Sequence, residues 1–497
     1  MAKKIPQKEG ADYSALVVDL DNTLVATDTL VESIILSLKS QPFSIFLMLL
    51  WLFKGKAFFK NQLAQRACPN TAFLPYRQEV LEYIGKAKER GIPVILATAS
   101  HQRIAKSVAG HLGLFSDVLA SNAETNLSGR RKLKAILAST GGRPFAYVGD
   151  CFKDIPIWEA AGQAVLVDPS ATLLQRLKGH PKMDIIRSKQ RHNTLRTWVK
   201  ALRLHQWAKN FLVFIPAIMA HQIVEPAIFF HLVFAFLSLS LSASSVYLLN
   251  DLLDLEADRQ HSQKKYRPLA SGTFSISKAL VLIPIFLIAG IWLALFGLPL
   301  PFFFSLFIYL LLTSLYSFFL KQKIIIDVIV LASLYTLRVI AGAIAVNILV
   351  SSWLLAFSMF FFLSLALMKR YSELLMMPDS LEQIPGRGYV RFDSETTLAS
   401  GIASGQLSLL VFALFMNGEH MQNLYGMPQL LWFVLPVLFY WLTRMWMIAH
   451  RGEMTEDPIV FTIKDPASYV ALVIIILIII AASQHMGPFI SVRFLEP

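Results

Sequence analysis

Residues 250–268 read NDLLDLEADRQHSQKKYRP, a strongly charged stretch that lies between two long apolar segments. Asn250, Asp254 and Asp258 follow one another at intervals of four residues, which places them on one face of a helix. Stacked carboxylates repel one another unless a cation lies among them, and charged residues at a membrane boundary are usually functional. The stretch therefore predicts a site for Mg²⁺ carrying a diphosphate. A flanking carboxylate and two cations suited to phosphate oxygens accompany it: Asp251, Lys264 and Arg267.

Long apolar segments dominate the C-terminal part of the chain. Hydrophobic residues make up 55% of the 497 residues and charged residues only 16%, which is far from a soluble average. We predict about nine membrane spans, at residues 210–221, 227–249, 279–297, 301–320, 324–346, 351–368, 399–416, 429–447 and 467–486. Basic connections alternate with connections that lack Lys and Arg. The positive-inside rule then predicts an inner-membrane protein whose N-terminal domain and candidate sites are cytoplasmic, with its C-terminus outside.

Net charge and cysteine content narrow the class of protein. The formal charge of +13 is explained by basic cytoplasmic loops, so no nucleic-acid partner is expected. The two cysteines, Cys68 and Cys151, give no disulfide framework and fit a reducing compartment. The start, MAKKIPQKEG, lacks the apolar core of a signal peptide, and no cleavage is expected.

The N-terminal part has the pattern of a soluble α/β domain. Short runs rich in β-branched residues, such as ALVVDL, IPVILATAS and PFAYVGD, alternate with helical stretches, which favours a parallel sheet flanked by helices. We expect this Rossmann-like domain over residues 1–185, a basic connector over 186–209 and the transmembrane domain over 210–497. Residues 31–75 are long enough to form a cap inserted into the first domain.

The cap contains PFSIFLMLLWLFKGKAFFK, a nearly unbroken apolar run followed by lysines. A helix needs about 20 apolar residues to cross a bilayer, so this run is too short. Two interpretations stay open: a buried cap helix, or a helix that lies in the membrane interface with Trp51 and the lysines at headgroup level.

Polar residues at the ends of the predicted strands indicate phosphoryl transfer. DLDNT supplies Asp19 and Asp21, a candidate nucleophile and a candidate acid/base. ATAS places the Thr98 hydroxyl at the end of the next strand, where it can hold a phosphate oxygen. SGRRK offers Lys132 as a fixed cation, with Lys134 as the alternative. VGDCFKD adds two further carboxylates suited to Mg²⁺: Asp150 and Asp154.

These four motifs, in this order, resemble the haloacid dehalogenase (HAD) superfamily over residues 14 to about 170. The resemblance implies a phosphatase with Asp19 as nucleophile, Asp21 as acid/base, and Thr98 and Lys132 holding the phosphate. It also implies Mg²⁺ bound by carboxylates of the motifs: Asp19, Asp21, Asp150 and Asp154.

Further cations recur on the predicted cytoplasmic side of the spans. They form a pool of candidate phosphate ligands, with one tyrosine: Lys209, Tyr316, Lys321, Arg338, Lys369 and Arg370. Arg338 lies inside a predicted span, where an unpaired charge is costly, so a partner carboxylate or phosphate is expected. Asp327, eleven residues earlier and on roughly the same face, is the carboxylate that the spacing suggests.

The charged stretch at 250–268 and the segment YSFFLKQKIIIDVIVLASLYTLRVIAGA resemble the two motifs of the UbiA superfamily of intramembrane prenyltransferases. Aromatic prenyltransferases usually carry several carboxylates in the second motif, but this segment has only Asp327. With LRLHQWAKN, LMKRYSEL and EDP at 456–458, the pattern is more similar to the decaprenyl-phosphate phosphoribosyltransferase branch. That resemblance implies transfer from phosphoribosyl pyrophosphate to a polyprenyl phosphate, with Asp254 catalytic and Mg²⁺ held by Asn250, Asp251, Asp254 and Asp258.

The fusion suggests that the two sites act in sequence, the phosphatase removing the 5-phosphate from the lipid-linked product. Two alternatives stay open: an aromatic or quinone prenyltransferase that uses a prenyl diphosphate, and a transporter or lipid-binding scaffold with a vestigial phosphatase. Neither the polyprenyl length nor the oligomeric state can be predicted from the sequence.

Overall fold

The computed structural model describes residues 13–41, 43–188, 194–261, 263–378, 382–384, 386–418, 425–454 and 457–483. The chain forms two compact units, one of residues 1–202 with 248–282 and one of residues 203–247 with 283–497. The charged stretch at 250–268 therefore belongs to the same compact unit as the N-terminal domain. The domain boundaries near 185 and 210 stay a prediction.

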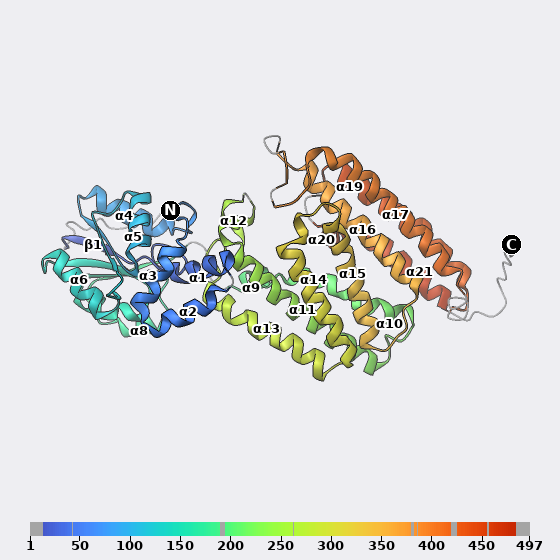
Figure 1. The fold of residues 1–497 in the computed structure, drawn as a ribbon, viewed down its shortest axis with the longest axis horizontal. Helices are drawn as coiled ribbons and strands as arrows, with labels where there is room; N and C mark the ends of the chain where they lie inside the picture. The colour runs from blue at the N-terminus through green and yellow to red at the C-terminus, as the bar shows by residue number, and fades with distance from the viewer. Residues whose placement is uncertain are drawn as a thin grey trace, which may run out of the picture. The chain divides into compact units, whose positions relative to one another are not determined.

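A six-stranded parallel sheet forms the centre of the first unit (Figure 1). Its strands lie in the order β3-β2-β1-β4-β5-β6, and every neighbouring pair is parallel. The strands are β1 (Ala15–Val18), β2 (Val94–His101), β3 (Asp117–Ser121), β4 (Phe145–Gly149), β5 (Gln163–Val167) and β6 (Met183–Ile186). Burial on both faces explains why the four central strands, β2, β1, β4 and β5, read as continuous apolar runs and not as alternating ones.

Helices connect the strands and cover the two faces of the sheet. They are α4 (Gln78–Glu89), α5 (Gln102–Leu112), α6 (Arg130–Thr140), α7 (Ile155–Ala160) and α8 (Ala171–Arg176). Three more helices follow β1 and form the cap: α1 (Thr29–Ser40), α2 (Ser44–Phe53) and α3 (Lys56–Arg66). The predicted α/β domain with an inserted cap is confirmed.

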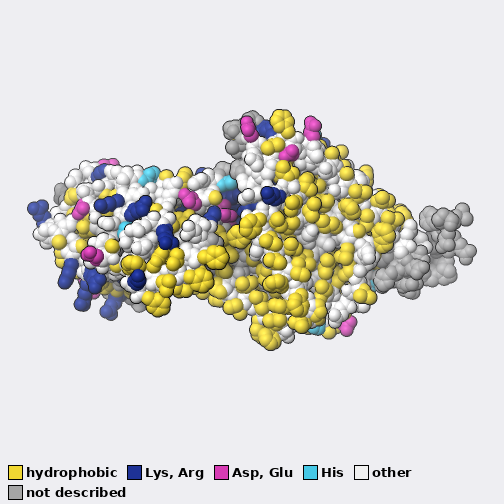
Figure 2. Space-filling model, in the orientation of Figure 1, with side chains coloured by type: hydrophobic (Ala, Val, Ile, Leu, Met, Phe, Trp, Pro, Cys, Tyr) yellow, Lys and Arg dark blue, Asp and Glu magenta, His cyan; other side chains and the backbone are white. Residues whose placement is uncertain are grey.

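The rest of the chain is helical. Among the described residues, eight helices are long and apolar enough to cross a membrane. They contain α11 (Pro226–Leu253), α13 (Ile276–Phe296), α14 (Leu300–Phe318), α15 (Ile326–Ala345), α16 (Ser352–Leu375), α17 (Ser394–Met416), α19 (Val434–His450) and α21 (Pro466–Ser483). Figure 2 shows hydrophobic side chains covering the face of these helices that is in view, as a lipid-facing surface requires. The protein is therefore a multi-pass membrane protein.

The first expected span, at 210–221, is not a long α-helix. The 3₁₀-helix η3 (Leu204–Phe214) continues into the short α10 (Ile215–Met219), and the pair is too short to count among the eight spans. Because a 3₁₀-helix rises about 2.0 Å per residue, against about 1.5 Å in an α-helix, the pair still extends roughly 30 Å.

Small residues let the spans of the second unit approach closely. The Ser238 hydroxyl donates to the Gly290 carbonyl at 2.8 Å, and a Cβ on Gly290 would lie 2.3 Å from Ser242 Oγ. The serine-rich face of α11 therefore packs directly against the backbone of α13, as polar and small residues do between membrane helices.

Candidate active sites

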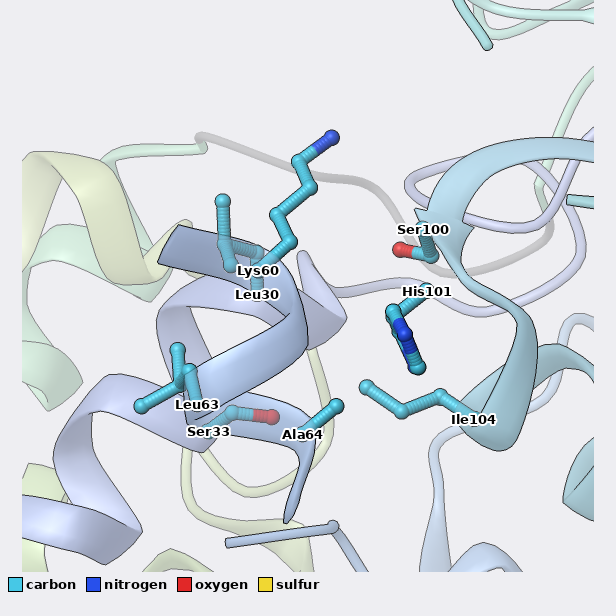
Figure 3. A pocket seen from close by; sticks show the side chains of 8 residues that line it. All are labelled: Leu30, Ser33, Lys60, Leu63, Ala64, Ser100, His101 and Ile104. Atoms are coloured by element: carbon cyan, nitrogen blue, oxygen red, sulfur yellow. The ribbon is translucent and has the colours of Figure 1, made fainter. Parts of the chain in front are cut away.

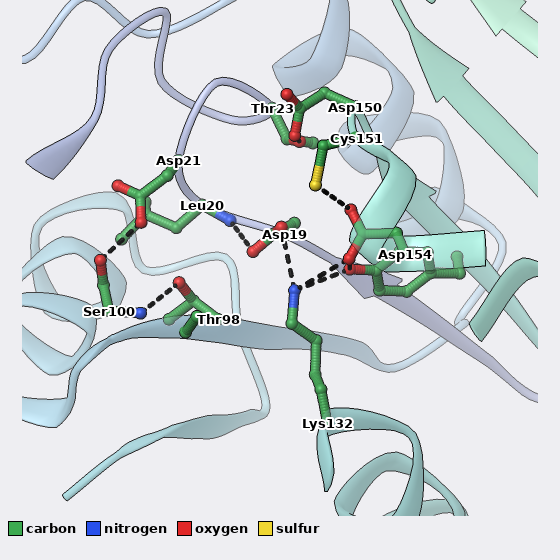
Figure 4. Close-up of polar contacts among 12 residues, drawn as sticks. Asp19, Leu20, Asp21, Thr23, Thr98, Ser100, Lys132, Asp150, Cys151 and Asp154 are labelled. Carbon is green, nitrogen blue, oxygen red and sulfur yellow. Dashed lines mark hydrogen bonds and ion pairs between the residues drawn. The ribbon is translucent and has the colours of Figure 1, made fainter. Parts of the chain in front are cut away.

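The N-terminal site lies at the carboxyl end of the parallel sheet. Asp19 directly follows β1 and is buried, and its Oδ1 accepts the Leu20 N–H at 2.8 Å. Lys132 Nζ, from α6, lies 2.9 Å from Asp19 Oδ2 and 3.3 Å from Asp154 Oδ1 (Figure 4). Lys134 is exposed, so of the two lysines it is Lys132 that belongs to this cluster.

Three carboxylates share this cluster with one lysine. Burial raises the pKa of Asp19 to about 8 although Lys132 opposes the shift, and burial with Asp154 raises the pKa of Asp150 to about 7. When all three carboxylates are ionised they outweigh the single lysine, and a divalent cation would balance the excess negative charge. Ligand atoms of Asp150, Cys151 and Asp154 lie within 4.8 Å of one another. Because Mg²⁺ prefers oxygen ligands, the carboxylates fit it and the thiol does not.

Tyr147 is a member of the cluster that sequence reasoning missed. Lys132 Nζ donates to its hydroxyl at 2.9 Å, and the hydroxyl donates to Asp154 Oδ1 at 2.9 Å. Tyr147 lies in β4 and reads as a core residue, and only its buried hydroxyl, which needs a partner, signals the polar role.

The Asp21 carboxylate faces the cap and not the other three carboxylates (Figure 4). Its Oδ1 accepts from the N–H and the hydroxyl of Thr29, at 2.8 and 2.7 Å, and its Oδ2 accepts from the Ser100 hydroxyl at 2.5 Å. The Ser100 N–H in turn donates to the buried Thr98 hydroxyl at 3.0 Å. Asp21 and Thr98 are thus joined through Ser100, which sequence reasoning missed because a strand serine carries no distinct signal.

A small pocket lies between the cap and the end of β2 (Figure 3). Its wall includes Ser100 and His101, and the buried His101 Nε2 has no hydrogen-bond partner among the described residues. Burial, with Arg103 and Lys60 nearby, lowers the pKa of His101 and favours the neutral ring. The remaining lining residues are Leu30, Ser33, Lys60, Leu63, Ala64 and Ile104.

The acidic motif at 250–268 is less regular than its spacing predicts. Helix α11 ends at Leu253, and a new helix, α12 (Leu255–Gln260), begins after Asp254, so the three residues do not lie on one unbroken helix. The expectation of a single helical face was wrong in this respect. The Asp254 N–H still donates to the Asn250 carbonyl at 2.9 Å, and the Asp258 N–H donates to that of Asp254 at 2.8 Å, which preserves the four-residue spacing.

Two carboxylates of the motif share one arginine. Arg267 Nη1 lies 3.1 Å from Asp251 Oδ1 and 2.6 Å from Asp258 Oδ2. Burial raises the pKa of Asp258 and Arg267 opposes the shift. Two buried carboxylates against one half-buried arginine again leave an excess of negative charge that suits Mg²⁺. Lys264 lies exposed in the short η4 (Lys264–Tyr266), close to this motif in sequence.

Cap helix α1 is ion-paired to the same motif within the first unit. The side chains of Glu32 and Arg259 are both buried and meet through two hydrogen bonds, of 2.5 and 2.9 Å. At the end of α1, Lys39 Nζ lies 3.2 Å from Asp254 Oδ1, in a pair that is largely exposed. Gly272 lies against the loop after β1, where a Cβ on it would be 2.7 Å from the Ala26 carbonyl oxygen.

In the second unit, two lysines share one carboxylate. Lys209 Nζ and Lys369 Nζ lie 3.0 and 2.9 Å from the same oxygen of Asp457. Burial raises the pKa of Asp457, but the two ammonium groups outweigh it and hold that pKa well below its usual range. Lys209 also lies 5.4 Å from the centroid of the Tyr335 ring. Glu456, which precedes Asp457 in the EDP motif, is outside the described residues.

Arg338 is buried, and Asp327, the carboxylate that the spacing suggested, is not its partner; a phosphate as its partner stays a prediction. Its guanidinium donates to Asn210 Oδ1 at 2.7 Å, to the Leu334 carbonyl and to the Tyr309 hydroxyl at 3.0 Å. Among the described residues, neutral oxygens thus solvate this charge. The sequence gives little indication that Asn210 contacts Arg338, because Asn210 lies at the edge of an apolar segment.

Asp327 is fully buried and already neutralised. Arg370 Nη2 lies 2.7 Å from its Oδ2, Arg387 Nη1 lies 3.7 Å from the same oxygen, and the Tyr389 hydroxyl donates to Oδ1 at 2.7 Å. Arg370 also pairs with Glu373. Sequence reasoning missed Arg387 and Tyr389, which reach Asp327 from about sixty residues away.

The last two candidates lie beside this cluster in sequence. The Tyr316 hydroxyl accepts from Arg387 Nη1 at 2.7 Å, which joins it to the Asp327 cluster. Lys321 is half-buried in the short η5 (Leu320–Gln322).

Family models match two parts of the chain. Residues 211–463 match the UbiA prenyltransferase family, and residues 16–157 match the haloacid dehalogenase-like hydrolases. The transferase match covers about half of the chain, and the hydrolase match covers strands β1 to β4 and the cap.

Individual relatives match most of the chain or a shorter part of it. A protein of Sinorhizobium fredii called Uncharacterized protein y4nM is 36% identical over 456 residues, which are 91% of this chain and 88% of that protein. Nodulation protein NoeC of Azorhizobium caulinodans is 32% identical over 286 residues, 56% of this chain and 90% of that protein. Decaprenyl-phosphate phosphoribosyltransferase of Mycobacterium tuberculosis is 36% identical over 185 residues, 35% of this chain and 59% of that protein.

Proposed function

Since the chain belongs to the UbiA prenyltransferase family and carries a haloacid dehalogenase-like hydrolase domain, we propose that it makes a lipid-linked pentose in two steps. The transferase joins phosphoribosyl pyrophosphate to a polyprenyl phosphate and releases pyrophosphate. The fused phosphatase then removes the 5-phosphate and leaves polyprenyl-phosphoryl-ribose. Both sites face the cytoplasm, at the inner membrane.

The state of Asp327 is the observation that favours a phosphorylated lipid over a prenyl diphosphate. A second Mg²⁺-diphosphate site needs several carboxylates with oxygens to spare. Asp327 is the carboxylate available in the second motif, and it is buried, paired with Arg370 and hydrogen-bonded by Tyr389. Lys209 and Lys369 offer instead two cations around a single carboxylate, which suits an anionic lipid headgroup.

In the transfer step, an oxygen of the lipid phosphate forms a bond to C1 of the ribose as the bond from C1 to the diphosphate breaks. The electron pair leaves with pyrophosphate, so no redox partner is needed. Asp251, Asp254 and Asp258 would hold Mg²⁺, which neutralises the leaving diphosphate when bound. Arg267, which pairs with Asp251 and Asp258, would then bind diphosphate oxygens.

In the hydrolysis step, Asp19 attacks the 5-phosphate and forms an aspartyl phosphate, which water then cleaves to release inorganic phosphate. Asp21 protonates the departing 5-oxygen and afterwards accepts a proton from the water. Lys132 and Thr98 hold phosphate oxygens. Asp19, Asp150 and Asp154 would hold Mg²⁺, which supplies charge neutralisation at the phosphate.

A comparison of two substrate pairs separates this function from the main alternative. Purified protein in nanodiscs is incubated either with labelled phosphoribosyl pyrophosphate and a polyprenyl phosphate, or with a prenyl diphosphate and an aromatic acceptor. We expect label in the lipid fraction only in the first case, and loss of that label in Asp254→Ala. Transfer only in the second case would refute the proposal, and transfer in neither case would favour a non-enzymatic scaffold.

A further inference from the structure

Cap helix α2 has an apolar surface that stays exposed among the described residues. Ser44, Met48 and Trp51 form a narrow buried stripe on this helix, and Met48 and Trp51 pack on Phe59 and Leu63 of α3. The other apolar side chains of α2 are exposed, among them Phe53 at 88%. They are Ile45, Phe46, Leu47, Leu49, Leu50, Leu52 and Phe53, seven of the ten residues of the helix. Figure 2 shows hydrophobic side chains where Figure 1 places α2.

This surface is too apolar to be an ordinary solvated face. Monomeric proteins rarely leave a contiguous apolar patch of this kind in water, and such patches mark contacts with membranes or partners. Lys54 and Lys56 follow α2 directly and are exposed, and the Arg66 guanidinium lies 4.7 Å from the Trp51 ring centroid. An apolar helix bordered by cations and a tryptophan has the composition of a helix that lies in the membrane interface.

Ion pairs hold the cap beside the point where two spans leave the membrane. Residues 254–275 connect α11 to α13, and both of these helices are long and apolar enough to span. Cap helix α1 is bound to this connection by the buried Glu32–Arg259 pair and by Lys39–Asp254. All of these residues belong to the first compact unit, so within that unit the cap lies close to the ends of two helices that can span a membrane.

From these observations we propose that α2 inserts its apolar surface into the headgroup–acyl boundary of the bilayer, parallel to the membrane plane. Ten residues are too few to cross the bilayer, and only the narrow stripe of α2 is buried against α3, which leaves the rest of α2 free for lipid. The basic residues after α2 contact lipid phosphates, which favours anionic membranes. The phosphatase is thereby held at the membrane surface, where phosphate groups carried by lipids lie within its reach. This inference does not depend on the proposed reaction.

Collision accessibility of nitroxide labels tests the proposal on the full chain in nanodiscs. Labels are placed at Phe46→Cys or Leu50→Cys in a Cys68→Ser/Cys151→Ser background. Lys178→Cys, exposed in the same unit, is the control. We expect labels at 46 and 50 to collide several-fold more with lipid-soluble oxygen than with a water-soluble nickel chelate, and the control label to show the reverse. The difference should grow when the nanodiscs contain anionic lipid.

Two results would overturn the proposal. One is a nickel accessibility at positions 46 and 50 equal to that of the control, which would mean that the helix lies in water. The other is exclusion of both reagents with dipolar broadening between labels, which would mean that α2 packs against a second copy of the chain. Because both side chains are exposed, the cysteine variants are expected to fold.

Discussion

Substitution Glu32→Gln is expected to release the loop that carries the acidic motif from the cap. Glu32 and Arg259 are 4% and 8% exposed as side chains, so removing one charge leaves the other buried without a counter-ion. Breaking such a pair costs about 3–5 kcal/mol. We take about 3 kcal/mol, because Arg259 keeps its hydrogen bond to the Ala270 carbonyl. Local opening of residues 255–275 then becomes roughly a hundredfold more frequent.

Amide hydrogen exchange, measured on the full chain in nanodiscs, reports how often this segment opens. The amides of α12 are expected to exchange roughly a hundredfold faster in Glu32→Gln. Lys39→Met is the matched control, because it removes an ion pair between the same helix and the same motif, but an exposed one. Such a pair is worth about 0.2–1 kcal/mol, so exchange should rise less than about fivefold.

A second variant tests the cause of the effect. Replacing both partners, as in Glu32→Gln/Arg259→Met, leaves no buried charge unpaired and should restore much of the protection. Equal exchange rates in Glu32→Gln and Lys39→Met would refute the reasoning, because the buried pair would then contribute no more than the exposed one.

Three further outcomes follow from the two sites and their supporting loop. Lys132→Met is expected to lower phosphate release by at least about a hundredfold while Lys134→Met leaves it unchanged, measured with a soluble phosphate ester. Chelation with EDTA should abolish both reactions. Added Mg²⁺ should restore transfer, measured as pyrophosphate release, in the wild type but not in Asp254→Ala. Gly272 has φ +75° and a close backbone neighbour, whereas Gly91 has φ +72° and open space around it. Gly272→Ala should therefore lower local stability, measured by hydrogen exchange, by about 1–3 kcal/mol more than Gly91→Ala does.

Features that depend on local sequence could be predicted well. Periodicity and strand-end motifs placed Asp19, Lys132, Asp150 and Asp154 at one edge of a parallel sheet, because parallel strands bring their carboxyl ends together. The length of the apolar segments predicted the spans, because a segment in lipid must form a helix in which its own backbone groups hydrogen-bond to one another. The first expected span failed because composition does not distinguish a 3₁₀-helix from an α-helix.

Features that depend on distant pairing could not be predicted. Asp457 meets Lys209 across 248 residues of sequence, and Arg259 meets Glu32 across 227. Such contacts are set by how helices pack, for which one sequence gives no spacing rule. The Arg338 error has the same origin: helical spacing put Asp327 within reach, but packing brought Arg370 to that carboxylate instead.

Mass spectrometry of the lipid product tests the central claim most directly. Wild-type protein and Asp19→Asn are each incubated with phosphoribosyl pyrophosphate, a polyprenyl phosphate and Mg²⁺, and the molecular masses of the extracted lipids are measured. We predict polyprenyl-phosphoryl-ribose from the wild type, and from Asp19→Asn the same lipid with one additional phosphate, formed at an unchanged rate. An identical lipid from both proteins would contradict the account, because the phosphatase would then act on some other molecule.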